Sequence, residues 1–164
     1  SEISAGIAAH FHMDSTQHLK DRDFEAARVA ALRGVDAHRE PDLVRAILLN
    51  QVAWCDLLTG NPALLEEAER YAIDALQLAP EHAAIKGTLG SVLIERGEHD
   101  RGIALLLESY SQVVEESHKA QTLAYLAIGY HRRGEPEKAD EVLRQAESLD
   151  KNDFLCERAR IVLR

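Results

Sequence analysis

The sequence is poor in aromatic residues and in cysteine. The first shortage limits which residues can build the core, and the second limits disulfide and metal sites. Aromatic side chains make up 5% of the 164 residues, so a core must be built mainly from Ala, Leu, Ile and Val. Only Cys55 and Cys156 are present, far apart and outside any Cys-x-x-Cys pair. This excludes a disulfide framework and a cysteine zinc site. We expect both thiols to be reduced and buried, in a cytoplasmic protein.

Long apolar runs and an excess of positive charge are also missing. No apolar run approaches the roughly 18 to 20 residues that a membrane helix needs, and the N-terminus lacks a basic segment followed by an apolar stretch. The formal net charge of -9 repels phosphate backbones and anionic lipids. We therefore expect neither a nucleic-acid partner nor insertion into a membrane. The first residue is Ser rather than Met, which favours a piece of a longer protein, such as the soluble arm of a membrane-bound enzyme or regulator.

No catalytic set can be recognised. The Ser and Cys residues show no nucleophile-elbow motif and no recognisable partner His, so we expect no enzyme activity and no cofactor. One alternative stays open: His10, Asp14 and His18 are four residues apart, with His12 nearby, and would stack on one helical face as metal ligands can. A metal-dependent enzyme or sensor that uses this first helix is therefore an alternative function.

An internal repeat is the strongest signal. Small residues recur at a period of 37 in three registers, namely Ala46, Ala83 and Ala120; Ala53, Gly90 and Ala127; and Gly60, Gly97 and Gly134. Each unit reads as two helices, of which the first ends at the glycine, where a left-handed residue costs least. Apolar and small residues at helical spacing predict the second helices.

These residues resemble the tetratricopeptide repeat (TPR) family, whose pattern places Leu-Gly and a later large residue in a first helix, then Gly, then a second helix with small residues. One repeat fits through Leu89, Gly90, Leu93, Gly97 and Ser109, and the next through Leu126, Ala127, Tyr130, Gly134, Ala139 and Ala146. The resemblance implies an all-α, right-handed α-solenoid of stacked antiparallel helix pairs.

We predict a single domain over residues 1–164. It would comprise a degenerate repeat at 1–41, repeats at 42–81, 82–117 and 118–151, and a capping helix at 152–164, with Asn152 as its cap. In the degenerate repeat, Arg22 replaces the usual turn glycine. Extra residues beginning at Asn61 and Pro62 are expected to extend one turn.

The resemblance further implies a non-catalytic protein-protein interaction scaffold that binds a peptide or helix of a partner protein in a concave groove lined by the first helices. The candidate groove residues are Asn50, Trp54, Ser91, Glu95, Gln121, Tyr125, Ile128, His131 and Arg132. Trp54 is equally compatible with a place in the core. Few Lys, Arg and Asn residues match the clamp of chaperone-binding members, so we predict no chaperone-tail binding. Self-association as a homodimer, through an incompletely capped end, is a third reading.

Overall fold

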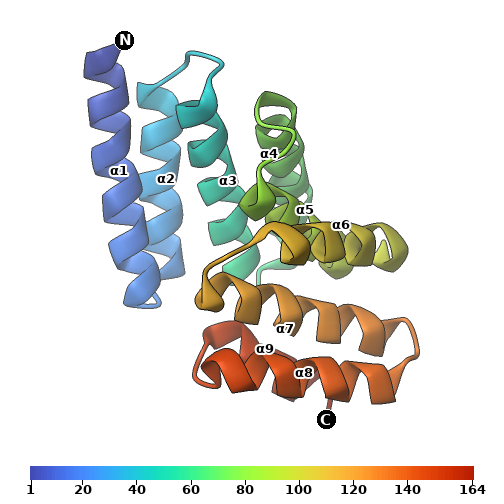
Figure 1. Cartoon of the computed structure of the whole chain (residues 1–164). Coiled ribbons are helices and arrows are strands. Elements are labelled where there is room, and N and C mark those ends of the chain that lie inside the picture. The colour runs from blue at the N-terminus through green and yellow to red at the C-terminus, as the bar shows by residue number, and fades with distance from the viewer. The chain divides into compact units, whose positions relative to one another are not determined.

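The chain folds entirely into helices. The computed structural model describes all residues 1–164, and the helices are α1 (Glu2–Lys20), α2 (Phe24–Ala37), α3 (Leu43–Leu58), the short 3-10 helix η1 (Pro62–Leu64), α4 (Leu65–Leu78), α5 (Ala83–Glu95), α6 (His99–Gln112), α7 (Glu116–Arg132), α8 (Pro136–Asp150) and α9 (Phe154–Val162) (Figure 1). The predicted all-α class is confirmed. None of these helices combines the length and the apolar character that crossing a membrane requires.

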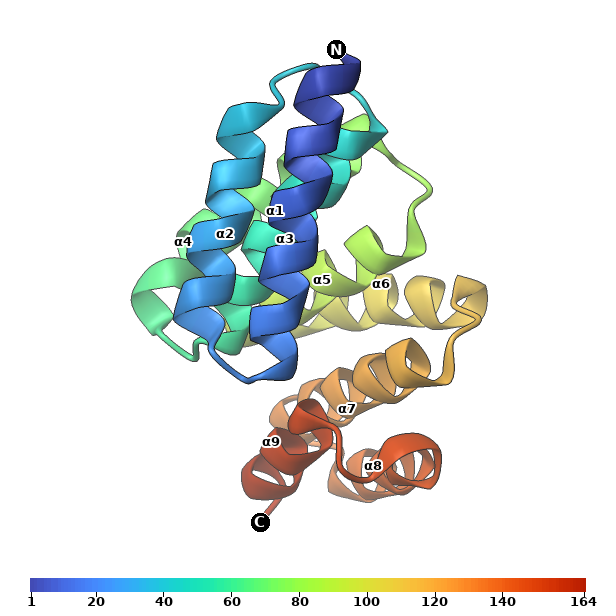
Figure 2. The same ribbon diagram turned by 90° about the vertical axis from the view of Figure 1, so that its left-hand side faces the viewer.

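The helices form two compact units, which we call unit 1 (Ser1–Thr88) and unit 2 (Leu89–Arg164). In unit 1, α1 pairs with α2 and α3 pairs with α4, and both helices of the first pair also contact α3. Figures 1 and 2 show α1 and α2 running side by side as an antiparallel hairpin. In unit 2, α7 pairs with α8, α6 packs on α7, and α9 contacts both α7 and α8.

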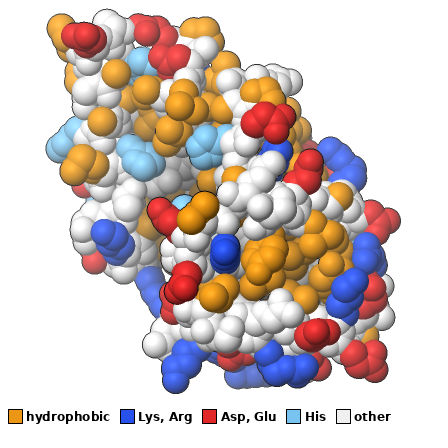
Figure 3. All heavy atoms as spheres, in the orientation of Figure 1, with side chains coloured by type: hydrophobic (Ala, Val, Ile, Leu, Met, Phe, Trp, Pro, Cys, Tyr) orange, Lys and Arg blue, Asp and Glu red, His pale blue; other side chains and the backbone are white.

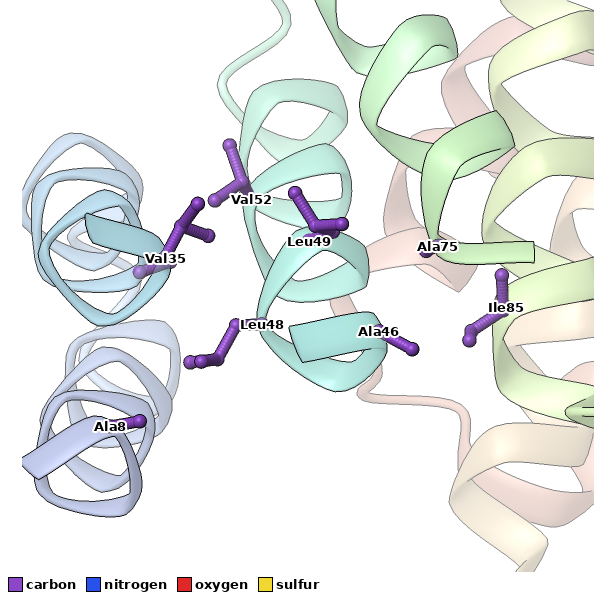
Figure 4. Packing of buried hydrophobic residues seen from close by; sticks show 9 residues of the cluster. Ala8, Val35, Ala46, Leu48, Leu49, Val52, Ala75 and Ile85 are labelled. Carbon is purple, nitrogen blue, oxygen red and sulfur yellow. The ribbon is translucent and has the colours of Figure 1, made fainter. Parts of the chain in front are cut away.

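Alanines allow the helices of unit 1 to pack closely. Ala8, Ala46 and Ala75 have no exposed surface and lie in one cluster with larger aliphatic residues. Figure 4 shows Leu48 of α3 pointing toward α1 and α2, whereas Leu49 lies on the side of α4. One side of α3 therefore packs against the first hairpin and another against α4, and the buried members of this core are all aliphatic.

Three of the four hairpin turns are closed by the predicted glycines. Gly60, Gly97 and Gly134 have φ of 71°, 86° and 91°, in the left-handed region that glycine adopts without penalty. Arg22 occupies the same place in the first turn with φ of 56°. In each turn this residue donates its backbone N–H to the carbonyl three residues earlier, so the degenerate first hairpin closes like the others.

Two local expectations concern helix starts. Asn61 accepts a hydrogen bond from the backbone N–H of Ala63 over 3.0 Å, and Pro62 opens η1. The extra residues thus lengthen the turn before α4, as expected. The expectation that Asn152 caps the last helix is wrong, because Asp153 accepts from the backbone N–H of Leu155 over 2.8 Å and α9 begins at Phe154. Asp153 is the residue directly before the first helical residue, which is the position from which a side chain caps.

Candidate partner-binding faces

In unit 1 the predicted groove residues Asn50 and Trp54 lie one turn apart on α3, and both are half-buried. The neighbouring Gln51 is buried and donates from Nε2 to Ser15 Oγ over 3.1 Å, which holds α1 against α3. Asn50 Oδ1 is itself shielded from water and accepts no hydrogen bond within the chain. A hydrogen bond from any donor that reaches such a buried, unpaired acceptor is stabilising.

In unit 2 a polar network joins three helices. The Tyr125 hydroxyl on α7 donates to Glu95 Oε1 over 3.1 Å and accepts from Arg158 Nη1 of α9 over 3.1 Å. Arg132 Nη1, at the end of α7, donates to Glu95 Oε2 over 3.0 Å. The carboxylate of α5 thus receives hydrogen bonds at both oxygens, and two guanidinium groups lie beside it.

The network is partly open to solvent. The side chains of Glu95 and Arg132 are 19% and 31% exposed, and Arg158 is half-buried. Farther along α7, the half-buried Gln121 donates from Nε2 to Asp153 Oδ2 over 3.2 Å. Burial raises the pKa of the Asp153 carboxyl. We call these two hydrogen-bonded groups together the polar edge of unit 2; they are Gln121 with Asp153, and Glu95 with Tyr125, Arg132 and Arg158.

Three of the predicted groove residues lie in the interior. Tyr125 and Ile128 have no exposed surface and Ser91 has 2%. Their side chains are enclosed by neighbouring helices, so they cannot present an apolar or hydroxyl surface to a partner. Burial, reinforced by the negative charge of Glu95, raises the pKa of Tyr125. Tyr125 therefore acts through its hydroxyl, as a buried support for Glu95. His131 is half-buried on the last turn of α7.

Sequence reasoning missed Arg158. Its guanidinium lies 5.0 Å from the centroid of the Phe154 ring and donates to Tyr125. Phe154 and Arg158 are one helical turn apart, which is the spacing at which side chains on a helix meet. That spacing, together with the equivalence of α9 to the first helix of a further hairpin, is the signal that could have found it.

The histidine-rich face of α1 does not assemble a group of metal ligands. The only contact among the predicted residues is between His18 Nε2 and Asp14 Oδ1, at 3.7 Å, and His10 is not part of it. Figure 3 shows several histidine side chains as separate pale-blue patches on the face of the molecule that it draws.

A different set, His38, Glu40 and Asp42, brings three ligand atoms within 4.8 Å of one another. Each of these groups already has a partner within the chain. His38 Nε2 lies 2.9 Å from Asp42 Oδ2, and Glu40 pairs with the ammonium group of Ser1. Asp42 also caps α3 by accepting from the N–H of Arg45, and this bond, followed by the His38 bond, lowers the pKa of Asp42. The cluster is accounted for by these internal bonds.

Comparison with known proteins finds one family model that matches part of the chain. Residues 81–152 match the sequence model of the tetratricopeptide repeat. Among curated proteins, none is significantly similar in sequence to this chain.

Solved structures extend the likeness over nearly the whole chain. Pseudomonas aeruginosa PilF is similar with a TM-score of 0.65 and 14% identity, covering 98% of this chain and 76% of that one. YrrB, described as a TPR protein with an unusual peptide-binding site, gives 0.59 and 16%, covering 94% and 74%. A thermophilic TPR protein from Thermus thermophilus gives 0.55 and 17%, covering 95% and 98%. At these identities the likeness shows the fold, and the predicted resemblance and solenoid class are confirmed.

Proposed function

We propose that this chain, which matches the tetratricopeptide repeat model over residues 81–152 and has the fold of solved TPR proteins, is a non-catalytic scaffold that binds a peptide or helix of a partner protein. The fold is one that serves protein-protein interaction. The proposed contact surface is the polar edge of unit 2, formed by the end of α5, α7 and α9. Cytoplasmic location and the grouping of the repeats into one domain stay predictions.

A hydrogen-bonded set of four residues carries the proposal. Glu95 and Arg158 meet at the buried Tyr125 hydroxyl, and Arg132 donates to the other oxygen of Glu95. Each charged side chain is fixed by at least one hydrogen bond, so little side-chain freedom is lost when a partner binds. The Arg132 guanidinium has five N–H donors, and its side chain is 31% exposed. A partner that offers carbonyl or carboxylate oxygens along this edge would meet a prearranged set of donors.

Asn50 and Trp54 supply a second contact surface, on α3 of unit 1. Oδ1 of Asn50 is buried and unpaired in the free chain, and a rotation of this half-buried side chain would let it accept a backbone N–H of an extended peptide. The half-buried indole of Trp54, one turn away, offers apolar area with little conformational freedom to lose. YrrB, whose description names a peptide-binding site, shares the fold and lends support to this use of it.

The test is selection of binding peptides from a random peptide library on the purified chain, followed by affinity measurement with variants. Arg132→Ala and Glu95→Ala remove the two exposed members of the network and are expected to weaken peptides that use unit 2 by tenfold or more, about 1.4 kcal/mol. Asn50→Ala is expected to do the same for peptides that use unit 1.

Arg144→Ala provides the matched control, because Arg144 is exposed on the second helix α8 and lies outside the polar edge. Its affinity for the selected peptides should equal that of the wild type. Circular dichroism of each variant establishes that it is folded. The proposed surfaces would be contradicted if the selected peptides bound Arg132→Ala, Glu95→Ala and Asn50→Ala as tightly as the wild type.

A further inference from the structure

Arg28, Asp56 and Glu67 meet inside unit 1, although they come from three different helices. Arg28 of α2 donates from Nε to Asp56 Oδ1 of α3 over 2.5 Å, and from Nη2 to Glu67 Oε2 of α4 over 2.7 Å. The side chains of these residues are 20%, 0% and 27% exposed, respectively. Because α2 belongs to the first hairpin and α3 and α4 to the second, the guanidinium links the two hairpins.

The hydrogen bonds of Asp56 are incomplete if its carboxyl group is ionised. Asp56 Oδ2 is shielded from water and receives no hydrogen bond from any donor in the chain. The Glu67 carboxylate lies within hydrogen-bonding reach of Asp56. Two ionised carboxylates can only accept, so they cannot bond to each other. One guanidinium charge would also have to balance two negative charges, of which the one on Asp56 is fully buried.

We propose that Asp56 is a neutral carboxylic acid that donates its proton from Oδ2 to the Glu67 carboxylate, so that one shared proton completes the link between the two hairpins of unit 1. The three groups then carry one positive and one negative charge, and every polar atom that faces inward has a partner. When the pH rises, the proton leaves to solvent, and two carboxylates remain against one guanidinium.

The electrostatics of the site favour this protonation state. Burial raises the pKa of Asp56 to about 7, and the hydrogen bond with Glu67 acts in the same direction. For Glu67, burial acts upward, but the hydrogen bonds from Arg28 and Asp56 outweigh it and lower the pKa. The proton therefore resides on Asp56, which is the more deeply buried carboxyl of the pair.

Other charged or titratable groups around the pair do not replace the proton. On α4, Arg70 stabilises the Glu67 carboxylate, and the pKa of Tyr71 is raised by burial and by Glu67 and Asp56. On α3, burial raises the pKa of Cys55 to about 12, so this thiol is neutral. On α1, Ser15 lies 3.7 Å from the Cys55 sulfur and carries no charge. Arg28 is thus the only cation bound to Asp56.

The sign of the pH effect follows from the folded and unfolded states. An unfolded Asp releases its proton near pH 4, whereas folded Asp56 holds it up to about pH 7. Between these values the folded chain binds one proton more than the unfolded chain, so stability falls as pH rises through this window. Above it, no further loss arises from this group.

Asp56→Asn provides the test, because the Asn amide nitrogen can donate to Glu67 while its oxygen accepts from Arg28. The amide thus imitates the neutral acid and does not titrate. In urea unfolding from pH 4 to pH 8, we expect the wild-type unfolding equilibrium constant to increase relative to that of Asp56→Asn, by up to about tenfold per pH unit below pH 7. Asp36→Asn removes an acidic group of α2 whose side chain is 79% exposed and should follow the wild type.

The protonation state can also be read directly in the wild type from the pH dependence of the carboxyl carbon chemical shift of Asp56 by NMR. A titration midpoint of Asp56 well above the ordinary Asp range supports the proposal. In Glu67→Gln the midpoint should shift downward, because the Gln amide can donate a hydrogen bond to ionised Asp56. A midpoint in the ordinary Asp range would overturn the proposal. Identical pH profiles for wild type and Asp56→Asn would overturn it as well, and the NMR measurement decides if Asp56→Asn does not fold.

Discussion

The hydroxyl of Tyr125, a residue with no exposed surface, donates a hydrogen bond to Glu95 Oε1 over 3.1 Å. The buried ring of α7 therefore fixes a half-buried carboxylate of α5 that stands at the edge of the proposed binding surface. Because Arg158 donates to the same hydroxyl, the oxygen is both donor and acceptor, and removing it leaves two charged groups without this bridge.

Tyr125→Phe is expected to lower the free energy of unfolding by about 1–3 kcal/mol, which is the cost of leaving polar groups near charged partners unsatisfied. Urea unfolding measures the effect. Tyr110→Phe, which removes a hydroxyl from a half-buried position on α6, is the control and should change stability by less than half as much. If both variants lost the same free energy of unfolding, the hydrogen bonds of Tyr125 would stabilise the chain no more than those of an ordinary tyrosine hydroxyl.

Gly90→Ala is expected to destabilise unit 2 by about 1–3 kcal/mol, the usual cost of overpacking. A Cβ at Gly90 would lie 2.9 Å from the carbonyl oxygen of Gly102 and 2.9 Å from Leu106 Cγ, so the backbone of α6 would have to move away. Thermal unfolding of the purified variant measures the loss.

Gly6→Ala is the matched control for this change. A Cβ at Gly6 meets nothing within 4 Å, and the residue lies within α1. Alanine there should raise stability by about 0.5–1 kcal/mol through helix propensity. Finding that Gly90→Ala is as stable as the wild type would mean that α5 and α6 do not approach as closely as the structure has them.

The turn and crossing positions could be predicted from the sequence because each is imposed by the backbone. Gly97 and Gly134 are needed for positive φ, so glycine recurs at the turns at a fixed period. Gly90 allows close contact between two backbones, at a position where the neighbouring repeats have the small residues Ala53 and Ala127. These backbone requirements are local, and each can be recognised in the sequence because it calls for glycine or another small residue. The repeats, their turns and the all-α fold therefore followed from a single sequence.

Which first-helix residues face a partner could not be predicted in the same way. Tyr125 and Ile128 occupy positions on α7 that resemble groove positions of the family, yet both are fully buried. Their burial is set by side chains of other helices, among them Glu95 and Arg158, whose positions depend on how the hairpins pack. The contact between the carboxyl groups of Asp56 and Glu67 could not be predicted from the sequence either, because packing of the helices brings these residues together.

Arg22→Gly is expected to raise the free energy of unfolding relative to Arg22→Ala by about 1 kcal/mol. Arg22 holds φ of 56° in the first turn, where a residue with a Cβ is strained and glycine is not. Both substitutions remove the arginine side chain and whatever it contacts, so the difference between them isolates the backbone effect. Urea unfolding of the two variants gives this difference, and equal stabilities would contradict the left-handed turn.

Cys55 and Cys156 are expected to be unreactive toward a disulfide reagent in the folded chain at pH 8. Both thiols are buried, and burial is the main cause that raises the pKa of each to about 12. Raised thiol pKa values mean that the neutral form dominates at pH 8, with a thiolate fraction on the order of one in ten thousand, and the thiolate is the form that reacts. The wild type should therefore react only when unfolded in guanidinium chloride, where both thiols become available. Ser117→Cys, at an exposed position of α7, supplies the internal standard and should release one equivalent of chromophore rapidly without denaturant. A native thiol that reacted as fast as this standard would show that the interior around α3 or α9 opens far more readily than its packing implies.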